Sequence, residues 1–401
     1  MMSRRKVVAS AFENTVVIAA ANSWDGVRMA DRQLAEALSA HVPVLYVDPP
    51  MSVMTRRRQP AAAAVAAAGR LRVLRPGLAR LVPEALPGLT RKGVAAVNVR
   101  LLAAQIRRAV MALGGSLDVV IDARVLAPII GRCGERLSVY WAQDDFVGLA
   151  PLLGLNADRL RRGERRMSRV ADVIIAANPH VARSMEHEDS PVELIPFGCD
   201  YENFAKASVE APDVTLTKPM AVFMGHVGDR IDAALLGAIA DRGTNLLVVG
   251  PQHHGAHMAQ FAEILDRPNV QWVGSKDFEE LPSYLMHAAV GILPYNHSRF
   301  NIGSFPLKTL EYLAAGLPVV ASDLPAIRWL DSPDITIAND PAGFADAVDR
   351  QVYGGRDMTG DSRRRDFARQ HTWAARATEF ARILETSRAA ESTNEVETAR
   401  K

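Results

Sequence analysis

This chain of 401 residues has few cysteines and lacks long apolar runs, and each of these features argues against a class of protein. There are only two cysteines, Cys133 and Cys199, and neither has a neighbour at metal-ligand spacing, which argues against a disulfide scaffold. No run approaches the roughly 18 apolar residues of a membrane-spanning helix. The basic N-terminus does not begin a signal peptide, because Glu13 interrupts the apolar run that follows it. We therefore expect a cytoplasmic protein, attached at most to the inner face of the cell membrane.

The residues that are present have the proportions of a globular protein. Hydrophobic residues make up 48% of the chain and charged residues 23%. A chain of this length is too long for one ordinary domain, so two domains of about 200 residues each are expected.

Basic residues are concentrated in one stretch of the first half. Residues 1–200 carry 27 Lys and Arg against 19 Asp and Glu, whereas residues 201–401 carry 20 against 26. Within residues 51–110 there are 12 basic residues and a single acid, Glu84. Such a segment, interleaved with apolar residues, suits an anionic membrane surface. A flexible, solvated loop followed by an amphipathic helix at 94–113 explains it equally well. Nucleic acid is not expected as a partner, because the segment has no Phe, Tyr or Trp to stack on bases.

Apolar runs alternate with helical patterns along the whole chain, which predicts two α/β domains of the doubly wound, Rossmann-like type. The first is expected over 1–205 and the second over 219–370, joined by a linker at 206–218. The predicted strands cover residues 16–20, 44–47, 119–122, 137–141, 173–176 and 192–195, then 221–224, 246–249, 270–273, 290–293 and 319–321. Two such domains face each other across a cleft, and ligands bind beyond the carboxyl ends of the strands.

Two loops of the first domain carry polar groups at such strand ends. Trp24 and Asp25 follow the first strand, and the adjacent acids Asp144 and Asp145 follow the fourth. An Asp at this position can simply cap a helix. Two neighbouring carboxylates in a cleft can instead raise one pKa and create a general base, and we favour this second interpretation.

In the second domain, a loop from Gly225 to Arg230 lies between a strand and a helix. It lacks the G-x-G-x-x-G dinucleotide fingerprint, and no acid ends the next strand to hold a ribose, so a nicotinamide dehydrogenase is disfavoured. Its backbone N–H groups and the Arg230 guanidinium suit a diphosphate. A surface ion pair of Arg230 with Asp229 or Asp232 is the alternative.

The most informative segment is residues 303–323. Pro306 begins a predicted helix, and Gly316 ends it. Lys308 and Glu311 are three residues apart, so they lie on one face near the helix N-terminus, where Lys can hold phosphate and Glu can accept hydrogen bonds from ribose. A plain surface ion pair has the same spacing.

This segment, with Pro306, Lys308, Glu311 and Gly316, resembles the donor-nucleotide motif of GT-B glycosyltransferases of the group 1 type. The chain is most similar to bacterial members that build exopolysaccharide, teichuronic acid and other cell-envelope glycans. Four weaker similarities occur in the same order as in that family. They are Tyr140 with Asp144, Asp145 and Phe146; Pro196 to Asp200 with Phe204; Gly225 with Arg230, Ile231 and Asp232; and Trp373.

The resemblance implies a GT-B fold whose C-terminal helix, at 371–390, crosses back to the first domain before a polar tail at 391–401. It also implies a site that binds a nucleoside-diphosphate sugar. Arg230 and Lys308 would grip the diphosphate, Glu311 the ribose, and the backbone of Val273 and Gly274 would face the base. Gly225 and Ser304 belong to the loops around the donor.

Across the cleft, the resemblance puts Asp144 or Asp145 on the acceptor side, with Trp24 and Asp25 in a neighbouring loop. The acceptor would be a glycan or a lipid-linked sugar, and neither a metal nor a cofactor is expected. Relatives often have two glutamates spaced E-x7-E, but the first falls here at Gly303. A retaining mechanism is therefore disfavoured, and we expect inversion with one of the two aspartates as base.

Two other functions remain open on the same fold. One is another enzyme, such as a nucleotide-sugar epimerase or a phosphorylase, although the basic segment has no evident role in an epimerase that acts on a small soluble substrate. A non-catalytic homologue is the third alternative, with Gly303 as its only sign.

Overall fold

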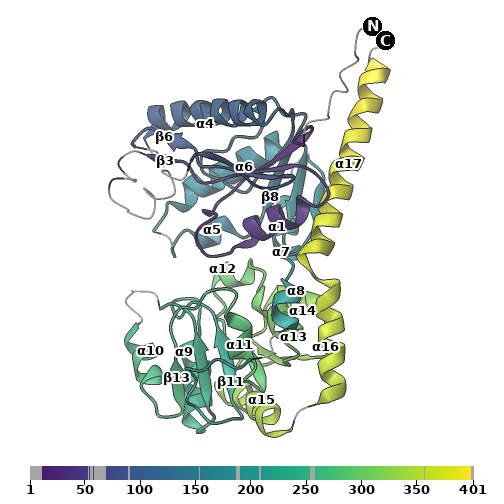
Figure 1. The fold of residues 1–401 in the computed structure, drawn as a ribbon. Helices are drawn as coiled ribbons and strands as arrows, with labels where there is room; N and C mark the ends of the chain where they lie inside the picture. Colours follow the sequence, from purple (N-terminus) through teal and green to yellow (C-terminus); the bar gives the residue numbers. More distant parts are fainter. Residues whose placement is uncertain are drawn as a thin grey trace.

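The chain forms two α/β domains, seen in a computed structural model that describes residues 11–52, 54, 57, 69–88, 91–152, 154–186, 190–206, 209–252, 258–355 and 357–398 (Figure 1). One domain is built on an eight-stranded sheet and the other on a six-stranded sheet. Both sheets are parallel apart from one antiparallel edge pair, β4 with β5. The expected GT-B architecture of two facing Rossmann-like domains is confirmed.

The first sheet has the strand order β10-β9-β8-β7-β1-β2-β5-β4. Its strands are β1 (Thr15–Ala19), β2 (Val44–Val47), β4 (Leu71–Arg75), β5 (Leu78–Leu81), β7 (Leu117–Asp122), β8 (Leu137–Ala142), β9 (Val173–Ala176) and β10 (Val192–Leu194), and a separate pair joins β3 (Met51–Ser52) to β6 (Glu84–Ala85). The helices are α1 (Ala30–Leu38), α4 (Lys92–Ala112), α5 (Phe146–Leu149), α6 (Ala157–Val170), α7 (Pro179–Met185) and α8 (Tyr201–Ala205).

Both faces of this sheet are covered by helices because its central strands carry apolar side chains on both faces. In β1, Val16 and Ile18 belong to the core beneath α1, whereas Val17 and Ala19 belong to the core beneath α4 and α6. The C-terminal helix lies on the α1 side.

The basic segment at 51–110 differs from the flexible loop expected for it, whereas its membrane contact stays a prediction. Residues 71–75 and 78–81 form the hairpin β4–β5, which extends the sheet beyond β2, so this part is not a flexible loop. Arg80 lies within β5 and is only 1% exposed. The hairpin was missed because Arg72, Arg75 and Arg80 interrupt two short apolar runs without a regular alternation that would mark a strand. The expected amphipathic helix is present as α4, and residues 53, 55–56, 58–68 and 89–90 lie outside the described part.

The second sheet has the order β13-β12-β11-β14-β15-β16. Its strands are β11 (Ala221–Met224), β12 (Leu246–Val249), β13 (Val270–Trp272), β14 (Val290–Leu293), β15 (Val319–Ala321) and β16 (Ile335–Ile337). Its helices are α9 (Ala233–Asp241), α10 (Met258–Leu265), α11 (Leu281–Leu285), α12 (Arg299–Ile302), α13 (Lys308–Ala314), α14 (Pro325–Leu330) and α15 (Pro341–Tyr353).

Two long helices end the chain: α16 (Met358–Gln370) beside the second domain and α17 (Trp373–Thr398) along the first (Figure 1). Backbone hydrogen bonds fix the place where the chain passes from the second domain back to the first. Cys199 N donates to His371 O at 2.9 Å, and Trp373 N donates to Cys199 O at 3.2 Å. A helix continues to Thr398, beyond the boundary expected at 390, because residues 391–398 contain no Gly or Pro to stop it. Among the described helices, none is long and apolar enough to cross a membrane.

Candidate functional site

The predicted site residues of the two domains lie on loops that face each other. Asp144 and Asp145 directly follow β8, and their loop leads into α5, which contacts α12 of the second domain. The loops after β11 and β14 carry Arg230 and α12, and α13 follows. Because the strands of each sheet are parallel, these loops gather at the carboxyl edges of the two sheets.

Asp145 has a structural role that its neighbour does not share. Its side chain caps α5 by accepting from Gly148 N at 2.8 Å. It also accepts from Arg299 of the second domain, at 2.8 Å from Nε and 3.3 Å from Nη2. With its oxygens used in this way, Asp145 is poorly placed to take a proton from a substrate.

Asp144 is half-buried, and no hydrogen bond or ion pair to its carboxylate is found among the described residues. Burial raises the pKa of Asp144 to about 7; Arg230 across the cleft acts to lower it, and the Asp145 charge acts to raise it. The helix-capping role that the sequence left open for Asp145 is thus confirmed. Asp144 retains the properties of a base near neutral pH.

Arg230 is held by α12 and not by a surface acid. Its Nε donates to Asn301 Oδ1 at 2.8 Å, and its Nη2 donates to Ser304 Oγ at 3.2 Å. The guanidinium also lies over the rings of Tyr295 and Phe300, 5.0 and 4.6 Å from their centres. No ion pair with Asp229 or Asp232 forms in the described structure, so the surface-pair alternative is wrong. These contacts use one edge of the guanidinium and fix its orientation.

The pair of Lys308 and Glu311 is also not a surface pair. Lys308 Nζ lies 2.7 Å from Glu311 Oε2, and the Glu311 side chain is only 1% exposed. Burial raises the pKa of Glu311, while Lys308 acts in the opposite direction. Desolvation offsets much of the attraction in such a buried pair, so the pair adds little to stability.

Small residues line the neighbouring loops of the second domain. Gly225 N donates to Val249 O and Gly250 N donates to Gly274 O, so the loops after β11, β12 and β13 are joined side by side. Gly274 has a φ of +73°, with no atom within 4 Å of the place where a Cβ would lie. The backbone of Val273 and Gly274 is therefore open on that side, as a flat base would require.

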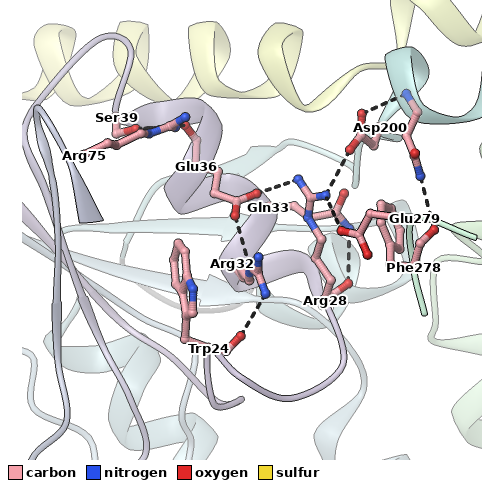
Figure 2. Close-up of polar contacts among 11 residues, drawn as sticks. Trp24, Arg28, Arg32, Gln33, Glu36, Ser39, Arg75, Asp200, Phe278 and Glu279 are labelled. Atoms are coloured by element: carbon pink, nitrogen blue, oxygen red, sulfur yellow. Dashed lines mark hydrogen bonds and ion pairs between the residues drawn. The ribbon is translucent and has the colours of Figure 1, made fainter. Parts of the chain in front are cut away.

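On the first domain, the loop after β1 is shaped by two buried acids. Asp31 accepts from the N–H groups of Ala21 and Asn22, and Asp48 accepts from Trp24 N at 2.8 Å. The Trp24 ring packs against the Arg32 guanidinium at 4.7 Å (Figure 2).

Asp25, in the same loop, forms an ion pair with an arginine of the sheet. Its Oδ2 lies 2.8 Å from Nη1 of the buried Arg80, whose Nη2 lies 2.7 Å from Asp48. The acceptor-side roles of Trp24 and Asp25 stay predictions.

Gly303 marks the place where the two domains touch. A Cβ there would lie 2.5 Å from Asp145 Cβ and 3.3 Å from His180 Cδ2. The Gly303 carbonyl accepts from Asn178 Nδ2 at 2.9 Å. A glutamate at this position would collide with the first domain, so the missing side chain reflects close contact between the domains.

Several residues of the site escaped the sequence reasoning. Asn301 is fully buried and donates to Arg230 O and Asn296 O, so it holds the Arg230 loop against α12. Arg299 pairs with Asp145 across the cleft. Gln143 is buried beside Asp144, and its Nε2 has no hydrogen-bond partner among the described residues. Only the proximity of these residues in sequence to the predicted motifs could have indicated them.

The arrangement combines an anion site and a base. Arg230, Lys308 and the loops after β11 to β13 can bind a diphosphate and its nucleoside, and Asp144 faces them from the other domain. The positive groups can stabilise a leaving diphosphate while Asp144 accepts a proton.

Known proteins resemble this chain in sequence and in fold. Residues 217–352 match the family described as Glycosyl transferases group 1, so the second domain is a domain of that family. A Bacillus subtilis (strain 168) protein named as a teichuronic acid biosynthesis glycosyltransferase, TuaH, is 29% identical over 227 residues. That alignment covers 53% of this chain and 57% of TuaH, so the chain spans little more than half the length of this curated relative.

Two solved structures share the fold over nearly the whole chain. Sucrose-phosphate synthase from Thermosynechococcus elongatus has a TM-score of 0.67 at 18% identity, covering 94% of this chain and 100% of that one. Anabaena Alr3699/HepE in complex with UDP-glucose has a TM-score of 0.64 at 13% identity, covering 93% and 99%. The second domain thus matches the group 1 glycosyltransferase family, and the whole chain has the fold of these two proteins.

Proposed function

We propose that this protein is a glycosyltransferase that moves a sugar from a nucleoside-diphosphate donor to a glycan or lipid-linked acceptor of the cell envelope. The observation that carries the proposal is the position of Asp144, a half-buried carboxylate with a pKa of about 7, opposite Arg230 of a group 1 domain. One domain offers the anion site, and the other offers a base that is half ionised at neutral pH.

The donor would lie on the second domain. Arg230 and Lys308 would bind the diphosphate, Glu311 the ribose, and the backbone of Val273 and Gly274 the base, with Gly225 and Ser304 beside the phosphates. The HepE complex with UDP-glucose supports a nucleotide sugar of this class. No metal is needed in this mechanism, because the two cations supply the positive charge that the leaving group requires.

Transfer would proceed with inversion. Asp144 takes the proton of the acceptor hydroxyl as its oxygen forms the new bond to the anomeric carbon. The bond from that carbon to the diphosphate oxygen breaks at the same time, and the nucleoside diphosphate leaves with the electron pair. The name of TuaH supports an envelope glycan as the product. We propose that this product is made at the inner face of the membrane.

The donor site is tested by calorimetry with UDP and UDP-glucose. Lys308→Ala and Arg230→Ala should each weaken binding roughly 10- to 100-fold, because each removes a charge-assisted contact to phosphate. Arg242→Ala is the matched control: Arg242 pairs with Asp349 on α15, and it precedes β12 at the opposite edge of the sheet. Unchanged affinity in both site variants would refute the donor assignment.

A further inference from the structure

Helix α6 of the first domain carries an unusual density of positive charge. Six of its 14 residues are arginines, namely Arg159, Arg161, Arg162, Arg165, Arg166 and Arg169. Its acids are Asp158, which pairs with Arg161 at 2.5 Å, and Glu164. In the described structure, the other five arginines form no ion pair.

The fold turns these arginines outward. Leu160 and Met167 are buried in the core beneath the sheet, and Asn156 caps the helix by accepting from Arg159 N at 2.9 Å. With 3.6 residues per turn, the arginines then occupy the opposite half of the helix. Arg162, Arg165, Arg166 and Arg169 are exposed. The charges therefore stand on a rigid helix and share one face.

An apolar loop lies at the N-terminus of this face. Leu152 is 37% exposed and Leu155 is 41% exposed, and both precede the capping Asn156. Exposed leucines next to a dense cationic face are typical of proteins that sit at a lipid interface, where the charges meet headgroups and the apolar side chains enter the bilayer.

This face adjoins the cleft. Helix α5, which begins at the Asp145 cap, packs against α6 (Figure 1). Burial raises the pKa of Glu164, in the middle of α6, to about 7, and the charges of Asp145 and Arg299 are near enough to act on it. Anything bound at this face lies close to the acceptor side of the cleft.

We propose that the exposed arginines of α6, with Leu152 and Leu155, form a docking surface for an anionic lipid bilayer. In this position the membrane presents a lipid-linked acceptor to Asp144, a consequence that rests on the proposed function. A nucleic acid is a poorer occupant, because residues 150–170 contain no Phe, Tyr or Trp.

The same structure weakens the case for residues 51–110 as the membrane contact. Arg80 is buried against Asp25 and Asp48, and Arg70 pairs with Glu84 at 2.6 Å. The exposed Arg91, which precedes α4, and the exposed Arg100 and Arg108 on α4 remain available and provide a matched comparison.

The test is sedimentation of the full chain with vesicles of phosphatidylglycerol and phosphatidylcholine in equal amounts, and with vesicles of phosphatidylcholine alone. Wild-type protein should bind the anionic vesicles and lose binding as salt is raised. The triple variant Arg162→Gln, Arg166→Gln, Arg169→Gln should bind on the order of a hundredfold more weakly, since each arginine near anionic lipid contributes about fivefold. The control Arg91→Gln, Arg100→Gln, Arg108→Gln removes the same charge and should bind as wild type.

The leucines give a second readout. Leu152→Ser with Leu155→Ser should weaken vesicle binding severalfold, and this loss should persist at raised salt because it removes apolar contacts. Equal losses in the two arginine triples would show binding to general positive charge and overturn the proposal, as would an absence of vesicle binding by the wild type. Tighter binding to single-stranded DNA than to vesicles would also overturn it. Donor affinity measured by calorimetry is independent of this surface, so failure here is distinguishable from failure of the proposed sugar transfer.

Discussion

Adjacent aspartates at the end of β8 acquire different chemistry from their surroundings. Asp145 meets a helix N-terminus and the guanidinium of Arg299, both of which stabilise its charge. Asp144 is half-buried without a close partner, and its pKa rises to about 7. The two adjacent carboxylates therefore have different roles: Asp145 makes structural contacts, and Asp144 is able to exchange a proton.

Asp144→Asn should lower turnover by about 10²- to 10⁴-fold while leaving donor affinity unchanged, because it removes the base alone. The same change should stabilise the protein at pH 8. The pKa of Asp144 is higher in the folded chain than the ordinary value of 3.8. The folded state therefore binds more protons than the unfolded state between about pH 4 and pH 7, and stability falls as pH rises through that window. Asn cannot ionise, so the variant should avoid this loss, worth about 2 kcal/mol for a half-buried group.

Urea titrations at pH 5 and pH 8 check the second part: the stability advantage of the variant over wild type should be larger at pH 8 than at pH 5. For wild type, kcat/KM should rise with pH and level off above about 7. Asp145→Asn is the comparison, since Asn also caps helices, and it should keep turnover within about tenfold of wild type. If Asp145→Asn is inactive and Asp144→Asn turns over normally, the assignment of the base is wrong.

Some strands of the first sheet can be predicted from the sequence, and others cannot. Continuous apolar runs such as β1 and β2 were predicted from sequence because burial on both faces requires them. The β4–β5 hairpin was not, since Arg72, Arg75 and Arg80 break the apolar pattern. The buried charge of the Arg80 guanidinium is compensated by the carboxylates of Asp25 and Asp48, which lie in other loops and form ion pairs with it. Those long-range partners have no signature in the local sequence.

Arg80→Met should therefore destabilise the first domain strongly. Removing the cation leaves Asp48 buried without its partner, and breaking such a pair costs about 3–5 kcal/mol. Burial already raises the pKa of Asp48, which shows how unfavourable its charge is there. Arg70→Gln is the control within the same segment: Arg70 is half exposed and paired with Glu84, so its loss should cost under about 1 kcal/mol. Denaturant midpoints measure both; equal effects would mean that β5 is not part of the folded core.

The same distinction applies to the site. Lys308 and Glu311 were predicted together because helical spacing is local, and the structure joins them. The contacts of Arg230 with Asn301 and of Arg299 with Asp145 connect loops that are far apart in sequence. Spacing along the chain cannot specify these contacts, so the sequence predicted the groups that carry charge and missed those that orient them.

Across the whole molecule, side chains of the two domains contact each other at several points. The edge of the Phe197 ring contacts Phe305 of the second domain, 5.9 Å between centres, and Phe197 also packs on Trp373. This aromatic contact lies beside the backbone crossing at Cys199. Polar contacts also join the domains: Asp145 with Arg299, Asn178 with Gly303, and Arg28 with a loop of the second domain. Closure over a donor would exclude water from the reaction.

Arg28 is the contact best suited to a test of closure (Figure 2). Its guanidinium lies 2.6 Å from Glu36 in its own domain, 3.3 Å from Asp200 at the domain junction and 3.8 Å from Glu279 of the second domain. It also lies over the Phe278 ring at 4.9 Å. One side chain thus joins α1 to the loop after β13, which also carries the predicted base-binding residues.

Arg28→Ala should favour the open arrangement of the domains. Partly screened ion pairs contribute about 0.5–1 kcal/mol, so KM for the donor should rise roughly two- to fivefold. Small-angle scattering should show a larger radius of gyration without donor and the wild-type value at saturating donor. Arg32→Ala is the matched control, because Arg32 binds Glu36 and Trp24 within the first domain. An equal rise in donor KM for both variants, with no change in scattering, would mean that Arg28 stabilises α1 and does not hold the domains together.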